Sequence, residues 1–258
     1  MKGKRSAAIA AALLLALAGG FFLYSAISDL RRAPEPVTAD PGVQINEPPE
    51  AKRDDAPAPT VDEPAYASPI DFTALRAVNA DICAWLDMAD GDISYPVVAA
   101  PPGDFYLNHD SDGNRSGDGA IFLETEYNHE PFEDPVTILY GHRRPSGAMF
   151  GKLQPLFSDA AYVSDAPDMK IYTESGELTY RFFAAVPYSS SHILYYFDFS
   201  DPQVFSDFFE GIMHTRDMGS QFAPENVPEA GDKVLILSTC LYGDAQRRFL
   251  VMGKLLSD

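Results

Sequence analysis

Two segments of the chain place a reactive side chain directly after a short apolar run. Cys240 follows the run VLILS, and the segment after it, LYGDAQRRFLV, carries Arg247 and Arg248 before a second apolar run begins. The thiolate is the nucleophilic form of cysteine, and neighbouring cations favour it. Cys240 is therefore a candidate nucleophile, with a structural thiol as the alternative interpretation of the same residues.

His142 occupies a similar place after another apolar run, in the segment ILYGHRRPSGAMFGKL. Gly141 before it predicts a tight backbone turn. A histidine on a loop at the end of a strand can reach a neighbouring catalytic group, and an ordinary surface histidine is the alternative. The other histidines have no comparable position: His109, His129, His192 and His214.

Metal chemistry is the main competitor, because acidic and polar residues alternate between Asp110 and Asp118. The spacing fails the calcium-loop pattern, since the glycine is Gly113 and Ile121 stands at the twelfth position. No His/Cys spacing resembles a zinc site, and the serine-hydrolase pattern G-x-S-x-G is absent from the sequence. We therefore expect no metal site.

The first element of the folded part is predicted to be a helix that Asp71 caps. Its apolar positions, Leu75, Val78, Ile82 and Trp85, follow helical spacing. Cys83 lies beside this stripe and is interpreted as a small buried residue. Two cysteines could also form one bridge in an oxidising compartment, so that possibility stays open here.

Beyond this helix, short apolar runs separated by turn residues predict strands. They cover Ile93–Val98, Ala120–Leu123, Val136–Tyr140, Met169–Tyr172, Leu178–Val186, Val234–Ser238 and Phe249–Leu255. A further helix is predicted from about Pro202 to Met213, and the stretch 110–119 reads as a loop. The fold class is mainly β, as an antiparallel barrel or sandwich with peripheral helices.

Residues 1–69 differ in composition from this part. Residues 1–6 are basic, and residues 7–28 form an uncharged apolar run that is long enough to cross a bilayer as a helix. Residues 29–69 are rich in Pro, Ala and acidic residues and predict an extended linker. These segments predict a cell-membrane protein with one membrane-spanning anchor, a cytoplasmic N-terminus and an extracellular catalytic part. A cleaved signal peptide is the alternative interpretation of the apolar run.

The formal net charge of −19 argues against nucleic acid as a partner, because phosphate binding requires a basic surface. The aromatic content of 12% and hydrophobic content of 46% supply ample material for a core.

Taken together, these segments resemble the class B sortases of Gram-positive bacteria. YGHRRPSGAMFGKL and LILSTCLYGDAQRRFLVMGKL look like the two signature segments of that family. DFTALRAVNADICAWL, ISYPVV, FYL and GAIFLE match in the same order. The resemblance covers residues from about 71 to 255 and implies that 70–258 form a sortase catalytic domain. It also implies an eight-stranded barrel with N-terminal helices and an added helix before the penultimate strand.

The resemblance implies an activity as well. Such enzymes cleave a C-terminal sorting signal of a secreted protein after Thr and hold the acyl part as a thioester. They then transfer it to an amine of a cell-wall precursor or to a pilin lysine, with no cofactor. By position, Cys240, His142 and Arg248 match the catalytic trio, whereas Tyr140, Leu107, Ser238 and Thr239 match the substrate groove.

Two departures and two rival functions accompany this expectation. Gly103 stands where the family often has Asn, and RRPSG follows His142 in place of the usual Asn-Met pattern. The rivals are a thiol hydrolase or protease of the same fold, which would release its acyl group to water, and a non-catalytic surface-anchored binding module.

Overall fold

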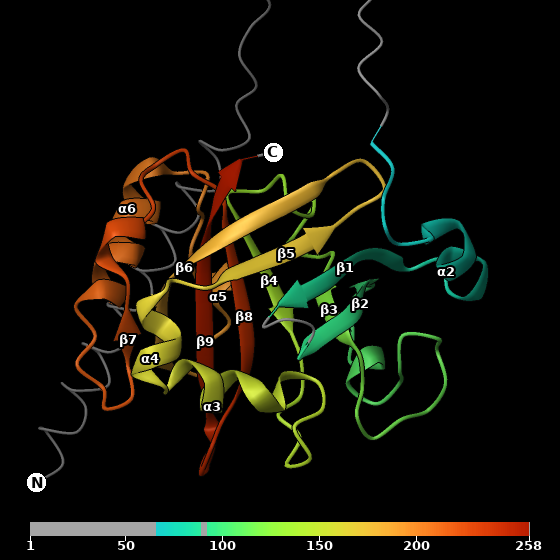
Figure 1. Cartoon of the computed structure of the whole chain (residues 1–258), viewed down its shortest axis with the longest axis horizontal. Coiled ribbons are helices and arrows are strands. Elements are labelled where there is room, and N and C mark those ends of the chain that lie inside the picture. The colour runs from blue at the N-terminus through green and yellow to red at the C-terminus, as the bar shows by residue number, and fades with distance from the viewer. Residues whose placement is uncertain (1–65, 89–91, 258) are drawn as a thin grey trace, which may run out of the picture. The chain divides into compact units, whose positions relative to one another are not determined.

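Strands that alternate buried and partly exposed residues close into a barrel in the part of the chain that the structure describes. This computed structural model describes residues 66–88 and 92–257, which belong to the unit Val61–Asp258. Eight strands follow the order β5-β1-β2-β3-β4-β8-β9-β6, and pairing of β5 with β6 closes the ring (Figure 1). The short β7 pairs with the edge of β6. The predicted eight-stranded barrel is confirmed.

The barrel contains both strand directions. The strands are β1 Ile82–Met88, β2 Ile93–Ala100, β3 Ile121–Glu124, β4 Val136–Tyr140, β5 Asp168–Tyr172, β6 Glu177–Ser189, β7 Gln221–Phe222, β8 Val234–Leu241 and β9 Asp244–Ser257. The pairs β2–β3 and β4–β8 are parallel, while the other pairs in the described ring are antiparallel. The antiparallel prediction therefore holds for most of the sheet, with two parallel pairs that it did not include.

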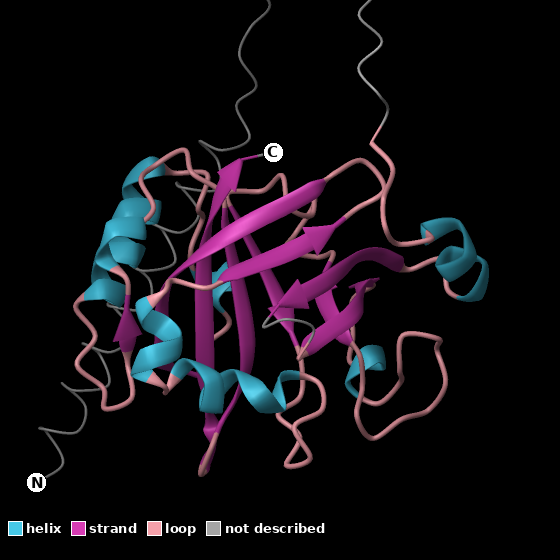
Figure 2. Cartoon of the chain, in the orientation of Figure 1, coloured by secondary structure: helices cyan, strands magenta, loops and turns pink. Residues whose placement is uncertain are grey.

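Helices are few and short, and they lie outside the barrel (Figure 2). They are α2 Phe72–Val78, α3 Leu153–Phe157, α4 Ala160–Ser164, α5 Ile193–Tyr196 and α6 Pro202–Met213, with 3₁₀ turns η1 Phe105–Leu107, η2 Phe150–Lys152 and η3 Pro224–Asn226. Helix α6 has the predicted bounds. Its first turn is fixed by Asp201, whose carboxylate accepts from Gln203 N and Val204 N.

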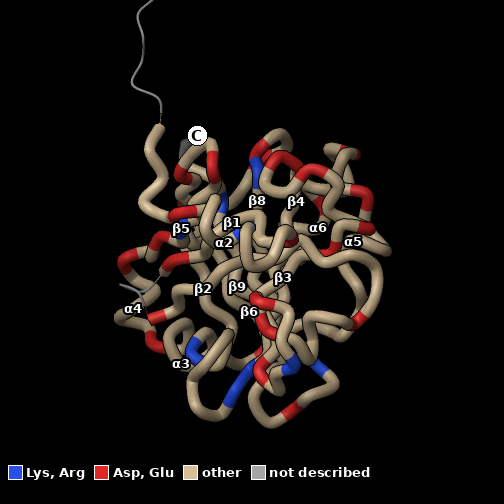
Figure 3. The backbone as a smooth tube through the Cα atoms, turned by 90° about the vertical axis from the view of Figure 1, so that its right-hand side faces the viewer, with Lys and Arg blue, Asp and Glu red and all other residues tan. Residues whose placement is uncertain are grey.

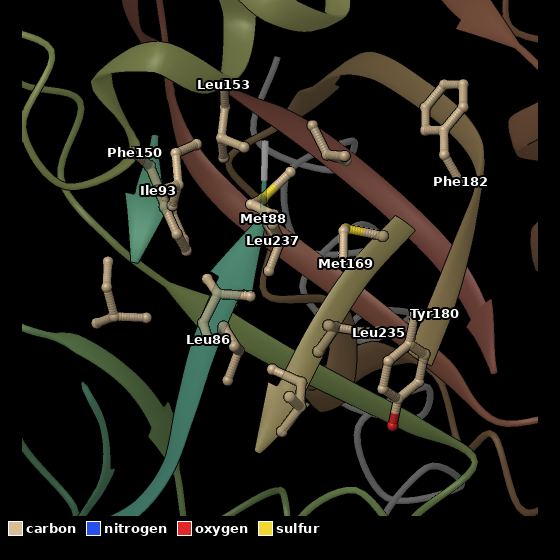
Figure 4. Packing of buried hydrophobic residues seen from close by; sticks show 14 of the residues in the cluster. Leu86, Met88, Ile93, Phe150, Leu153, Met169, Tyr180, Phe182, Leu235 and Leu237 are labelled. Atoms are coloured by element: carbon tan, nitrogen blue, oxygen red, sulfur yellow. The ribbon is translucent and has the colours of Figure 1, made fainter. Parts of the chain in front are cut away.

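Period-2 alternation divides the core into an inner and an outer layer. On β8, Leu235 and Leu237 point into the barrel with residues of the other strands (Figure 4). Ile236 points outward and packs with the apolar face of α6, which includes Phe205 and Phe209. Cys240 has the same parity as Ile236, so it belongs to the outer face.

The predicted first helix is wrong in length. Asp71 does cap α2, accepting from Ala74 N at 2.9 Å, but the helix ends at Val78. Ile82 begins β1, in which alternate residues are buried from Ile82 to Met88. This segment satisfies a period of two as well as a helical one, and pairing with β2 and β5 decides between them.

The predicted localisation is contradicted. Within residues 66–88 and 92–257, no helix is long and apolar enough to cross a membrane. The prediction of a single-pass cell-membrane protein with an extracellular catalytic part is therefore corrected. The stretch 7–28, which was predicted to be the anchor, and the segments 1–6 and 29–65 lie outside the described residues.

Candidate active site

Three neighbouring strands direct the predicted site residues to the same outer face of the barrel. In the parallel pair β4–β8, Tyr140 lies opposite Ser238. In the antiparallel pair β8–β9, Cys240 lies opposite Arg248. Side chains two positions apart on a strand share a face. Together with Leu107 and His142 they line a groove of about 350 Å³.

Arg248 contacts the sulfur of Cys240 across the strand pair. Its Nη1 lies 3.8 Å from Cys240 Sγ, and the same nitrogen donates to the backbone oxygens of Ala245 at 3.3 Å and Arg247 at 3.5 Å. Guanidinium stays protonated in proteins. A cation held in this way stabilises negative charge on the sulfur or on an oxygen beside it.

Arg247 points away from this groove. Its Nη2 lies 2.6 Å from Asp217 Oδ2 in a partly exposed ion pair. Neighbouring residues of a strand face opposite sides, so the structure brings only one of the two adjacent arginines to Cys240.

His142 follows β4 and is held from behind by a backbone carbonyl. Its Nε2 lies 2.7 Å from Leu107 O. A carbonyl oxygen only accepts, so Nε2 carries the proton and donates, which leaves Nδ1 as the ring nitrogen that can exchange a proton in the groove. Leu107 therefore contributes its backbone oxygen as well as a partly exposed side chain.

The strand ends that carry His142 and Cys240 are tied to each other. Gly141 N donates to Ser238 O at 3.2 Å, and Thr239 Oγ1 donates to Gly141 O at 2.7 Å. Thr239 is buried, so its hydroxyl holds these two strand ends together. This contact fixes the backbone on both sides of the groove.

Gly141 serves close packing rather than the predicted tight turn. It is not among the described glycines with positive φ. A Cβ at this position would lie 2.5 Å from Ile121 Cδ1 and 2.7 Å from Phe150 Cδ2. The missing side chain lets the peptide before His142 lie directly against the core.

Tyr140 forms part of the groove floor as a protonated phenol. Burial raises the pKa of Tyr140 well above its ordinary value, and the nearby Glu124 carboxylate, as a charge and as a hydrogen-bond partner, raises it further. Its hydroxyl is therefore a hydrogen-bond donor at neutral pH.

Sequence reasoning missed a second polar pair in the same groove. Glu124 at the end of β3 and His192 before α5 both line it, with Glu124 Oε2 2.6 Å from His192 Nε2. In the sequence, His192 follows no apolar run directly, so its position does not indicate a catalytic role. The segment SSSHILYY offered a usable sequence signal for His192. Polar residues there precede a helical turn, which is the pattern of a residue that caps a helix.

Cys83 is a poor competitor for Cys240. Both cysteines are free thiols. Burial raises the pKa of the Cys83 thiol to about 12, so at neutral pH it is protonated and weakly nucleophilic. Cys83 Sγ also lies 3.5 Å from Val97 O within the sheet.

The acidic loop 110–119 uses its first carboxylate to shape the backbone. Asp110 Oδ1 accepts from Asp112 N at 3.1 Å and from Asn114 N at 2.9 Å. In the described part of the chain, no group of three or more His, Cys, Asp or Glu side chains is arranged to hold a metal ion.

Known proteins are similar to this chain in sequence and in fold. The chain matches no protein-family model. Sortase B of Listeria monocytogenes is 28% identical over 189 residues, which cover 71% of this chain and 73% of that protein. Sortase B of Staphylococcus aureus is 24% identical over 192 residues, covering 72% and 74%. The crystal structure of sortase B from B. anthracis in complex with AAEK1 has a TM-score of 0.62 and 29% identity, over 72% of this chain and 84% of that chain.

Proposed function

We propose that this chain, a class B sortase and so a cysteine transpeptidase, uses Cys240, His142 and Arg248 to cleave a C-terminal sorting signal after Thr. The observation that carries the proposal is the contact of Arg248 with Cys240 Sγ at 3.8 Å, in one groove with His142. The substrates are proteins that bear a sorting signal containing Pro and Thr.

In the first half-reaction, His142 Nδ1 takes the proton of the Cys240 thiol, and the resulting thiolate attacks the carbonyl carbon of the Thr residue. The C=O electron pair moves to oxygen, and the Arg248 guanidinium stabilises that oxyanion. When the oxyanion collapses, the C–N bond breaks and the leaving amine takes a proton from His142 Nδ1. The products are a thioester on Cys240 and a new amino terminus.

In the second half-reaction, His142 returns to its role as a base. Nδ1 removes a proton from an incoming amine, which attacks the thioester carbonyl, and the C–S bond breaks to release Cys240. The amine belongs to a cell-wall precursor peptide or to a pilin lysine. Leu107 O supports both steps by keeping the His142 ring in one orientation through Nε2.

Product analysis of one sorting peptide tests this function. We expect the purified chain to give a peptide–amine conjugate in the presence of a peptide amine, and Cys240→Ala to give no product. Cys83→Ala is the matched control and retains the conjugation. If only the hydrolysed peptide forms at every amine concentration, the chain is a hydrolase; if no cleavage occurs, the proposed function is wrong.

A further inference from the structure

A carboxylate lies in the groove away from the thiol. Glu124 ends β3, and its Oε2 accepts a hydrogen bond from His192 Nε2 at 2.6 Å. His192 Nδ1 accepts in turn from Tyr195 N at 3.1 Å. A ring whose Nδ1 accepts and whose Nε2 donates is a neutral imidazole. His192 therefore orients Glu124 without neutralising its charge.

The second polar neighbour of Glu124 is neutral as well. Tyr140 keeps its phenol proton, because burial and the Glu124 charge both raise its pKa. Tyr127 and Tyr140 also lie against the His192 ring, with centroids at 4.3 Å and 6.2 Å. Side chains of Glu124 and His192 remain about a third exposed. A charged carboxylate thus stands on an aromatic wall that reduces its contact with water.

Strand register fixes how far this carboxylate lies from the thiol. Phe122 of β3 pairs with Tyr140 of β4, and Tyr140 pairs with Ser238 of β8. Phe122, Tyr140 and Ser238 thus form one row across the three strands. Glu124 lies two residues from this row toward the amino end of β4, and Cys240 lies two residues from it toward the carboxyl end. Along the strands this separation is about 13 Å, the length of about four residues of an extended peptide, and the two strand spacings between β3 and β8 add about 10 Å across them. The Glu124 side chain covers part of the lateral distance, since its carboxylate is a hydrogen-bond partner of Tyr140 on β4.

The position of His142 indicates where the two parts of the cleaved peptide lie in the groove. His142 follows the carboxyl end of β4, so the leaving amine that it protonates lies at this end of the groove. The acyl part of the peptide then extends back along β4, over Tyr140 and toward Glu124. The end of the groove near the thiol carries the cation Arg248, so opposite charges stand at its two ends.

We propose that Glu124, oriented by His192, forms a subsite for a cationic side chain of the sorting peptide, lysine or arginine, three or four residues before the cleaved Thr. The inference rests on the proposed function and adds a charge preference to its substrate. The net charge of −19 favours the approach of such a peptide, and Asp and Glu positions are spread along the described backbone in Figure 3.

A peptide series tests the subsite. Each peptide carries one lysine at one of the five positions before Thr, and each has a partner with uncharged norleucine at that position. The readout is the ratio of kcat/KM for the two partners, at two salt concentrations. We expect a ratio of about ten at the third or fourth position, as for a partly desolvated charge pair, and a smaller ratio at high salt.

Variants locate the source of that ratio. Glu124→Gln brings it to about one, and Glu124→Lys makes glutamate the preferred residue at the same position. Glu126→Gln, an exposed charge change two residues away, and Asp104→Asn, on another wall of the groove, retain the lysine preference. Glu124→Asp keeps the charge and retains a preference, which separates loss of charge from loss of folding.

Two results would overturn the subsite: no lysine preference at any position, or a preference that survives in Glu124→Gln. If Glu124→Gln cleaves nothing, the result for Glu124→Asp decides, and absence of a lysine preference there counts against the subsite. Cleavage of neutral peptides by the unmodified chain without any preference contradicts the subsite alone. Failure to cleave every peptide contradicts the proposed function instead.

Discussion

Gly119 is expected to position His142, although it makes no chemical contact with a substrate. Its φ of +66° is a conformation that favours glycine. A Cβ built on it would lie 2.7 Å from Tyr106 O, 3.0 Å from Leu107 O and 3.1 Å from His142 Cδ2. Leu107 O is the acceptor of the His142 ring, so Gly119→Ala pushes on both partners of that hydrogen bond.

The effect separates into strain and displacement. An alanine in the left-handed region costs about 1 kcal/mol of stability. Relief of the 2.7 Å contact moves the carbonyls or the ring by several tenths of an ångström. Misplacement of a catalytic group by about 1 Å lowers turnover by about a hundredfold. We therefore expect Gly119→Ala to lower kcat about tenfold, with a smaller change in KM.

Two glycines in the same loop are controls for strain and for substitution itself. Gly113 has a φ of +82° with no atom within 4 Å of its Cβ position, so Gly113→Ala measures strain alone. Gly117 has neither feature. The assay is steady-state cleavage of one sorting peptide, with thermal unfolding of each variant measured in parallel.

The expected pattern is a loss of kcat that is specific to Gly119→Ala, while Gly113→Ala loses stability only and Gly117→Ala behaves as the unmodified chain. Equal kcat in Gly119→Ala and Gly113→Ala would show that the carbonyl and the ring tolerate the contact, and the positioning argument would then be refuted.

Two further predictions follow from the same site and sheet. Arg248→Ala is expected to lower turnover about 100- to 1,000-fold, as for loss of an oxyanion donor. Arg247→Ala should stay within a few-fold, because its pair with Asp217 is partly exposed and such pairs contribute about 0–1 kcal/mol; the reverse ranking in cleavage assays would show that the β9 register is shifted. As the pH rises, Cys83 loses its proton at a lower pH in the unfolded chain than in the folded one, because burial raises its folded pKa from 9.0 to about 12. The unfolded state then binds fewer protons, so the free energy of unfolding falls between pH 9 and 12, by about 1.4 kcal/mol per pH unit. Cys83→Ala should remove this slope near pH 9 to 10, below the range where Tyr106, raised from 10.0 to about 12, adds its own; an unchanged slope would contradict the assignment.

The strands that could be predicted from sequence are those in which apolar alternation is long and bounded by turn residues. Val136–Tyr140 was predicted with its observed bounds, and helix α6 likewise, since its four buried apolar residues follow helical spacing and Asp201 caps it. The segment from Ile82 failed because its apolar spacing fits both periods, and partner strands decide the outcome.

The candidate site was predictable where residues adjoin a strand. Cys240 is the last but one residue of β8, His142 follows β4 by two residues, and Arg248 lies within β9 opposite Cys240; the structure places all three in one groove. Glu124 and His192 were missed because their contact joins residues that are 68 positions apart. A pattern of neighbouring residues cannot reveal a contact between residues so far apart in the sequence. The position of Gly119 behind His142 likewise depends on how the loop 110–119 folds back onto the sheet.

The central claim, that Cys240 forms a thioester with the sorting peptide, is tested most directly by trapping that species. The purified chain is mixed with a sorting peptide without amine acceptor, quenched in acid, and analysed by intact mass and peptide mapping. We predict an added mass equal to the acyl part of the peptide, located on Cys240, lost on treatment with hydroxylamine, and unchanged in Cys83→Ala. Turnover without any adduct on Cys240, or an adduct on Cys83, would contradict the account.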